Sequence, residues 1–164
     1  MIKIIELADA QIPQAKKLVN EVFKHQDFTE RISFWVYKHR NKFWMKLLSW
    51  WYGTKSLEYW VAVDEKGTIC GTTGFYTQKK DIHEAIWLSW FCVAPARRGQ
   101  GIGKQLIEFS IKEAQSRGKK YLRLYTSDDP NEADAQFLYE KYGFVKTGEV
   151  KHDGWTLFYR EKVL

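Results

Sequence analysis

Apolar and polar positions recur along this chain with two periods, which together predict a mixed order of strands and helices. Residues 2–7 alternate as a first strand, and residues 9–24 carry an apolar stripe at helical spacing, with Asp9 placed to cap the helix. The stretch 29–52 contains no Gly or Pro, which favours helix, and Gly53 supplies a stop. On one continuous helix a single stripe holds Phe34, Tyr37, Trp44, Leu48 and Trp51, whereas Trp35, Phe43 and Trp50 fall outside it. Such a segment needs more than one apolar surface to cover it.

Strand patterns dominate from residue 59 onward. Residues 85–93 form a near-continuous apolar run, typical of a strand covered on both faces, and strict alternation places Trp87, Ser89 and Phe91 on one face. A Gly-rich turn leads from this run into a helix and another strand, which implies a right-handed crossover between parallel strands. The remaining predicted elements are a hairpin of 59–63 with 68–77, helix 101–117, strand 121–125, helix 132–142 and a final hairpin of 144–150 with 155–160. The predicted fold class is therefore α/β, of the mixed α+β kind.

Length and composition narrow the picture further. The chain has 164 residues and shows no repeat, linker or composition break, so we expect a single domain over residues 1–164. With 45% hydrophobic and 28% charged residues it resembles a soluble globular protein, not a collagen-like or disordered one. Cys70 and Cys92 lack CxxC spacing and no signal peptide is evident, which favours a reducing cytoplasm. The four histidines are scattered singly, so we expect no metal, and charges interrupt every window long enough to span a membrane.

The Gly-rich turn has the chemistry of an anion site. It comes off a buried strand into a helix N-terminus, where backbone N–H groups lack partners and the helix dipole is positive. Gly99, Gly101 and Gly103 allow unusual φ angles and remove Cβ atoms, while Arg98 and Lys104 add positive charge. A plain tight connection would not require three alternating glycines between two cations. The spacing fits neither a Walker loop nor a GxGxxG dinucleotide fingerprint, so the turn predicts a different phosphorylated ligand.

Two motifs resemble those of one known family. Arg98-Gly99-Gln100-Gly101-Ile102-Gly103, preceded by Val93-Ala94-Pro95, resembles the acyl-CoA-binding motif of the GNAT superfamily of N-acetyltransferases. A second family signature is matched downstream by Leu138-Tyr139-Glu140-Lys141-Tyr142-Gly143-Phe144. The resemblance implies a mixed, mostly antiparallel twisted sheet flanked by helices, with the strand–Gly turn–helix–strand unit binding CoA. It also implies that residues 1–164 form one N-acetyltransferase domain that uses acetyl-CoA as co-substrate.

The resemblance assigns roles to individual residues. CoA phosphates would bind the N–H groups and cations of the turn, the pantetheine arm would pair with the edge of the preceding strand, and an N–H near Val93 would polarise the thioester carbonyl. Tyr139 occupies the position of the general acid, although its place on an apolar stripe also suits a core aromatic. Glu84 is a candidate base, and water relayed past Ser89 is the alternative. The implied cofactor-binding residues are Phe91, Cys92, Val93, Arg98, Gly99, Gln100, Gly101, Ile102, Gly103, Lys104 and Asn131.

Two of these positions carry further interpretations. The family places an Asn seven residues before the Tyr, where this chain has Glu132, so Asn131 is the nearest substitute. Cys92 has no neighbour in sequence that would lower its pKa, so we expect a packed strand residue and not a nucleophile.

The implied reaction is acetyl transfer from acetyl-CoA to a primary amine by direct attack in a ternary complex. The acceptor is a small-molecule amine or a peptide N-terminus, and nucleic acid is not an expected partner. Dimers are common in the family, so a homodimer is a further expectation. The alternative is a catalytically inactive CoA-binding module of the same fold, acting as a sensor or interaction domain.

The net charge of +6 is concentrated in one part of the chain. The range Arg31–Lys55, here called the basic aromatic segment, holds six Lys or Arg and no carboxylate, and eight aromatics fall within residues 34–52. One interpretation is a core helix whose lysines remain solvated. A second, suggested by the family, is a wall of the acceptor site. A third is a membrane-surface or nucleic-acid contact, which the mixing of aromatics with charges along one helix disfavours.

Overall fold

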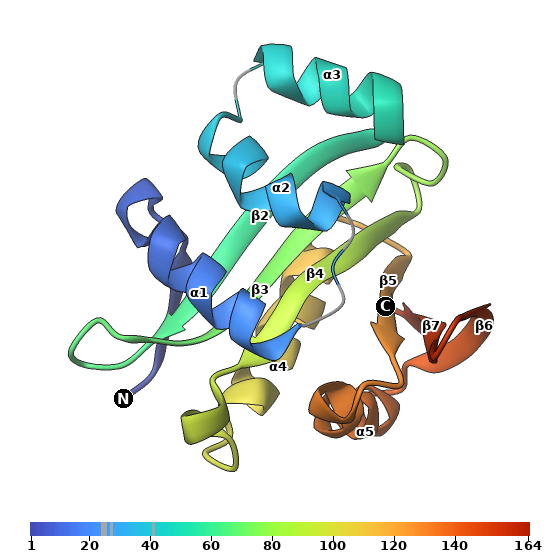
Figure 1. Ribbon diagram of the computed structural model, residues 1–164. Helices are drawn as coiled ribbons and strands as arrows, with labels where there is room; N and C mark the ends of the chain where they lie inside the picture. Colours follow the sequence, from blue (N-terminus) through green and yellow to red (C-terminus); the bar gives the residue numbers. More distant parts are fainter. Residues whose placement is uncertain (24–25, 27, 41) are drawn as a thin grey trace.

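The computed structural model describes residues 1–23, 26, 28–40 and 42–164, and a seven-stranded sheet forms its centre (Figure 1). The strands in spatial order are β1 (Lys3–Glu6), β2 (Thr54–Val63), β3 (Ile69–Gln78), β4 (Ala85–Val93), β5 (Tyr121–Ser127), β7 (Trp155–Val163) and β6 (Val145–His152). All neighbours are antiparallel except β4 and β5, which are parallel. The mixed, mostly antiparallel sheet and the parallel crossover are thereby confirmed.

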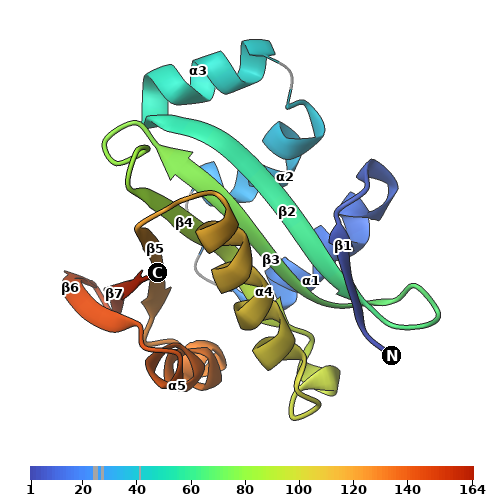
Figure 2. The same cartoon turned by 180° about the vertical axis from the view of Figure 1, so that it is seen from behind.

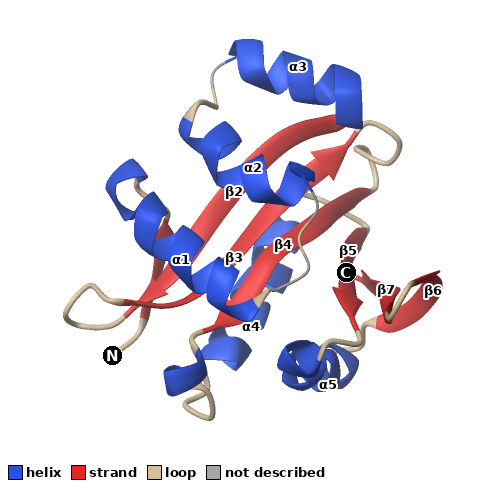
Figure 3. Ribbon diagram, viewed as in Figure 1, coloured by secondary structure: helices blue, strands red, loops and turns tan. Residues whose placement is uncertain are grey.

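Helices cover both faces of this sheet (Figure 3). On one face lie α1 (Ile12–Val22) and α2 (Phe28–Lys38), and on the other lies α4 (Ile102–Ser116), which is in front when the molecule is viewed from behind (Figure 2). The helix α5 (Ala133–Lys141) packs against α4, and α3 (Lys42–Tyr52) sits over the start of β2. Within the described ranges, none of these helices is long and apolar enough to cross a bilayer.

Each face of the sheet has its own apolar core. Under α1 and α2 the core includes Leu18, Phe34 and Tyr37, and under α4 it includes Leu106 and Leu122. Seven of the nine residues of β4 are buried, as its apolar run predicts for a strand between two layers. The central strands are thus fixed from both sides, which gives the loops at their ends a rigid base.

The N-terminal helices differ from the sequence prediction. The first helix begins at Ile12, and Asp9 lies in a preceding 3-10 turn without capping it; its carboxylate instead accepts a hydrogen bond from Arg40 at 3.0 Å. The stretch 29–52 forms two helices and not one. Arg40 also donates to the carbonyl of Tyr37 at 2.9 Å, which ends α2 where Tyr37 is anchored through its hydroxyl to the carbonyl of Leu7.

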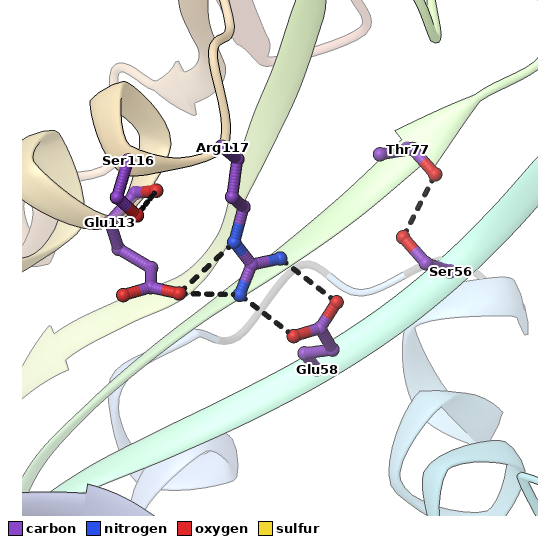
Figure 4. A network of polar contacts seen from close by, with 6 residues as sticks. All are labelled: Ser56, Glu58, Thr77, Glu113, Ser116 and Arg117. Carbon is purple, nitrogen blue, oxygen red and sulfur yellow. Dashed lines mark hydrogen bonds and ion pairs between the residues drawn. The ribbon is translucent and has the colours of Figure 1, made fainter.

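The strand β2 begins at Thr54, five residues before the predicted start, because contacts from distant elements stabilise its polar first half. At the end of α4, Arg117 donates to both carboxylate oxygens of Glu58 at 2.9 Å and also to Glu113 (Figure 4). The hydroxyls of Ser56 and Thr77 share a hydrogen bond of 2.8 Å across to β3 (Figure 4). These partners lie 21 or more residues away in sequence, beyond the range of a local pattern.

Candidate active site

The parallel strands β4 and β5 separate after a short paired stretch. Residues 85–87 of β4 pair with residues 121–123 of β5, and no pairing continues toward Val93. A cleft of about 1170 Å³ is lined by the diverging strands, α2, the Gly-rich turn, α5 and the β6–β7 hairpin. The backbone edge of β4 from Leu88 to Val93 therefore has no β5 partner in the cleft, and an extended ligand can use it for hydrogen bonds.

A bulge in β4 changes which side chains face this cleft. Gly74 pairs with Ser89 but Thr72 pairs with Cys92, so β4 has one extra residue, and Trp90 has a φ of 45°. Because of the bulge, Phe91 joins the core on the α4 face, which corrects the strict alternation expected from sequence. Trp90 turns toward α2, where its indole N–H donates to Ser33 at 2.8 Å.

The Gly-rich turn presents its backbone to the same cleft. Gly99 and Gly101 have φ angles of 74° and 78°, and a Cβ built on either would meet no atom within 4 Å. The backbone N–H of Gln105 donates to the carbonyl of Gly101 at 3.1 Å, and this is the first hydrogen bond of the helix. The N–H groups that precede Gln105 in the helix therefore have no intrahelical acceptor. Gly103 has an ordinary φ, contrary to expectation, and lies against Leu138.

Of the predicted cofactor residues, most meet at the cleft. Those that line it are Phe91, Cys92, Val93, Arg98, Gly99, Gly101, Ile102, Gly103 and Asn131, together with Tyr139. Gln100 and Lys104 do not line it, and Lys104 lies 4.0 Å from Glu108 on the outer side of α4. Arg98 donates to the carbonyl of Asn131 at 3.3 Å, which joins the turn to the loop before α5.

Tyr139 is buried between two aromatic rings. Its ring centroid lies 5.5 Å from that of Phe91 and 5.6 Å from that of Phe144. Burial, and secondarily the negative charge of Glu132, raise the pKa of Tyr139 well above its ordinary value. The phenol therefore carries its proton at neutral pH and has a hydrogen to donate.

Glu132, at the position of the family's Asn, has a structural role of its own. Its carboxylate accepts hydrogen bonds from the hydroxyl of Thr126 at 2.7 Å and from the amide and hydroxyl of Ser127 at 3.0 and 2.6 Å. These bonds fix the end of β5 to the start of α5 at the cleft wall. Asn131 lies beside it, and its backbone N–H donates to the carboxylate of Asp129 at 2.8 Å.

Glu84 is not brought together with the other predicted residues. It precedes β4 at the end remote from the Gly-rich turn, does not line the cleft, and pairs with Arg123 at 3.1 Å. At about 3.3 Å per residue, the five residues from Glu84 to Ser89 span roughly 16 Å along the strand. The geometry therefore gives no support to Glu84 as the base. Cys92, in turn, is buried, and burial raises the pKa of its thiol to about 12, as suits a packed strand residue.

The end of the cleft remote from the Gly-rich turn has an aromatic lining that no motif predicted. Tyr76, Trp87, Tyr125 and Tyr159 line it, with the Trp87 ring centroid 5.9 Å from that of Tyr76. Glu30 at the start of α2 adds a carboxylate, to which the hydroxyl of Tyr125 donates at 2.7 Å. These five residues lie on five separate elements, so only the fold brings them together.

The basic aromatic segment contributes little to this lining. It supplies Arg31, Ser33, Val36 and Thr54, and none of its aromatic side chains that the structure describes is among the lining residues. Its Phe34 and Tyr37 belong to the core, as the first interpretation predicts. The aromatic wall of the remote end therefore comes from other parts of the chain and not from the aromatic residues of this segment.

Comparison with known proteins agrees with the fold and the turn. Residues 55–146 match the model of the GNAT acetyltransferase domain. An uncharacterised N-acetyltransferase of Schizosaccharomyces pombe is 28% identical over 85 residues, which cover 46% of this chain and 32% of that protein. The chain thus spans about a third of the length of this curated relative.

Solved structures are similar over almost the whole chain. A GNAT-family acetyltransferase from Staphylococcus aureus Mu50 has a TM-score of 0.72 at 21% identity, covering 98% of this chain and 99% of that one. Ard1 from Thermoplasma volcanium has a TM-score of 0.72 at 16% identity, covering 99% of this chain and 97% of that one. The spermidine/spermine N-acetyltransferase SpeG from Vibrio cholerae, in mutant form, has a TM-score of 0.69 at 15% identity, covering 99% of this chain and 93% of that one. At these identities the likeness is one of fold, and together with the match of residues 55–146 it shows that the chain belongs to the GNAT acetyltransferase family.

Proposed function

We propose that this protein transfers an acetyl group from acetyl-CoA to a primary amine by direct attack, with both substrates in the cleft at once. One observation carries the proposal: the Gly-rich turn and the aromatic, carboxylate-bearing end open into the same cleft along the unpaired edge of β4. A donor held at one end and an acceptor at the other can therefore meet without a covalent enzyme intermediate.

The donor end fits a CoA-like substrate. Gly99 and Gly101 leave open space where side chains would stand, and the N–H groups at the start of α4 point their positive dipole at that space. Arg98 adds a cation, and the free edge of β4 would pair with a pantetheine arm as an added strand. The bound thioester supplies an acetyl carbonyl carbon that is open to attack by an amine.

Tyr139 is proposed as the general acid. The departing thiolate of CoA needs a proton, and the raised pKa of Tyr139 keeps its hydroxyl protonated at neutral pH. Its ring is fixed between Phe91 and Phe144, so the side chain is held in place before the substrates bind. Phe91 lies on the same strand edge that would hold the pantetheine arm.

Glu30 is proposed as the residue that binds the acceptor amine and takes its proton. An alkylamine has a pKa of about 10 and attacks only when neutral, so a carboxylate or a water must remove a proton first. Of the cleft carboxylates, Glu132 is engaged by Thr126 and Ser127, and the side chain of Asp134 is 85% exposed beside Arg98. Glu30 lies at the aromatic end of the cleft, where the hydroxyl of Tyr125 donates to it at 2.7 Å, and water past Ser89 could relay the proton.

The aromatic lining favours an amine attached to an apolar or cationic body, because ring faces attract both. SpeG, whose fold this chain shares, is named for spermidine and spermine, which supports an amine as the acceptor class. Both cysteines are free and buried, which suits a reducing cytoplasm as the proposed location.

The test follows the release of CoA thiol from acetyl-CoA by the purified protein against a panel of primary amines and peptide N-termini. Tyr139→Phe should lower kcat about 100-fold or more while CoA binding is unchanged. Tyr142→Phe is the matched control, since its hydroxyl bonds to Glu108 outside the cleft. Unchanged turnover in Tyr139→Phe would remove Tyr139 from the mechanism. A wild-type protein that binds CoA but acetylates no amine would support the inactive binding module instead.

A further inference from the structure

The exposed face of α3 is apolar, the reverse of an ordinary surface helix. Phe43, Leu47, Trp50 and Trp51 have exposed fractions of 67%, 42%, 78% and 67%. Their spacing of four, seven and eight residues from the first places them in one stripe along the helix. Trp44, at the edge of the stripe, and Met45, on the opposite side of the helix, are half-buried. A stripe of four large side chains, with three aromatic rings in water, is a contact surface that lacks its partner.

The break between α2 and α3 creates this stripe. On one continuous helix Phe43 and Trp50 would fall outside the stripe that holds Phe34 and Tyr37, so apolar and charged residues would be mixed around the axis. Because α2 ends at Lys38 and α3 begins at Lys42, the two helices are oriented independently, and each can direct a different face toward the core. Phe34 and Tyr37 then enter the core, and α3 presents its aromatic residues outward. The aromatic residues are therefore segregated, which the sequence alone did not indicate.

Exposed lysines occur on α3 and next to it in sequence. Lys46 is exposed on the same face of α3, and Lys38 and Lys55 are exposed at either side of the helix in sequence. No Asp or Glu occurs from Arg31 to Lys55, so no carboxylate of the segment itself offsets these cations. The surface thus combines aromatic residues with cations, which suits a partner that is apolar beneath an anionic outer layer.

We propose that α3 docks this protein on an anionic lipid membrane surface. The stripe would lie in the interfacial layer, where Trp rings prefer to sit, while Lys38, Lys46 and Lys55 contact the lipid headgroups. With eleven residues, α3 is about 16 Å long and lies in the plane of the surface instead of crossing it. Docking does not depend on the proposed acetyl transfer.

Two other occupants are less well matched. A second copy of this chain paired about a two-fold axis would bring the +6 segment against itself, which opposes association. A single-stranded nucleic acid would need a groove that follows its backbone, whereas α3 is a single helix at the outer edge of the molecule (Figures 1 and 2). A lipid surface needs no groove and carries the complementary charge.

Docking through α3 would also orient the cleft. Gly53 joins α3 to Thr54, which lines the remote end of the cleft together with Gln78 and Lys80. The carbonyl of Gly53 accepts a hydrogen bond from the amide of Lys79 at 2.7 Å, so the junction is fixed to the β3 end. The aromatic end of the cleft would therefore lie close to the membrane when α3 is docked.

The test is co-sedimentation of the purified protein with large vesicles of phosphatidylcholine alone and of an equimolar mixture with phosphatidylglycerol. We expect binding to the anionic vesicles, weakened by salt, and little to the neutral ones. The double variant Trp50→Ala/Trp51→Ala should bind at least about tenfold more weakly. Phe137→Ala on α5 is the matched control, because Phe137 is 72% exposed and lies outside the cleft.

A second pair of variants keeps the test independent of any effect of the tryptophans on folding. Lys46→Ala should weaken binding to anionic vesicles about fivefold, and Lys16→Ala, an exposed lysine of α1, should not. Absence of binding to anionic vesicles, or equal binding by wild type and both α3 variants, overturns the proposal. So does a lipid-free dimer that the tryptophan variant converts to monomer, or a single-stranded oligonucleotide that binds through these tryptophans when vesicles do not.

Discussion

Replacement of Gly101 by Ala tests whether the backbone of the Gly-rich turn holds the phosphates of CoA. Gly101 has a φ of 78° at the start of α4, and a Cβ added there would point into space with no protein atom within 4 Å. Gly67, in the turn between β2 and β3, has a φ of 76° and equally open surroundings, but does not line the cleft. The two substitutions thus impose a similar backbone strain, one inside the cleft and one outside it.

The expected magnitudes separate strain from ligand contact. An alanine in the left-handed region costs about 1–2 kcal/mol, which for a chain of this size lowers Tm by a few degrees in both variants. At Gly101 the methyl group also stands between a phosphate and the N–H groups of the turn. Losing one charge-assisted hydrogen bond costs about 1.5–3 kcal/mol, so CoA should bind about tenfold to a hundredfold more weakly. Gly67→Ala should leave this affinity unchanged.

The assay is isothermal titration of each variant with CoA and with pantetheine, alongside thermal unfolding. Pantetheine lacks the pyrophosphate, so its affinity should be the same for wild type and Gly101→Ala. If Gly101→Ala lowers Tm as Gly67→Ala does but binds CoA with wild-type affinity, the N–H groups of the turn do not hold the phosphates. Equal weakening of CoA and pantetheine would place the effect at the pantetheine arm and contradict the same reasoning.

Two further substitutions test packing and the acceptor site. Gly74→Ala would bring its Cβ within 2.3 Å of Tyr59 Cδ1 and should lower the free energy of unfolding in urea by about 1–3 kcal/mol. Gly148→Ala is the control and should be neutral, because the nearest atom to its Cβ is 4.0 Å away. Equal stability of the two variants would mean that β2 and β3 adjust freely. Glu30→Gln should raise KM for the amine about tenfold and leave CoA affinity intact, with Glu21→Gln on α1 as control. An unchanged KM would exclude Glu30 from acceptor binding.

The parts of the site that the sequence predicts are those formed by neighbouring residues. The Gly-rich turn needs only a buried strand, positive φ angles and a helix start, all of which lie between residues 85 and 116. The remote end of the cleft is different, because Glu30 and Tyr125 are 95 residues apart and meet only through the sheet order. Each of them alone is an ordinary helix or strand residue, so no local pattern distinguishes it.

Two of the local errors of prediction, those at Trp90 and after Lys38, share a physical cause that also bears on function. A prediction from hydrophobic periodicity assumes that a strand or helix continues without interruption. The bulge at Trp90 and the break after Lys38 each interrupt one and reset which face the following side chains occupy. Both resets are stabilised by contacts from elsewhere: Trp90 by its bond to Ser33 on α2, and the end of α2 by Arg40 with Asp9. A reset moves every later side chain of that element to another face. The edge of β4 that faces the cleft and the outward face of α3 are therefore consequences of tertiary contacts, and they are the surfaces on which the proposed catalysis and membrane docking depend.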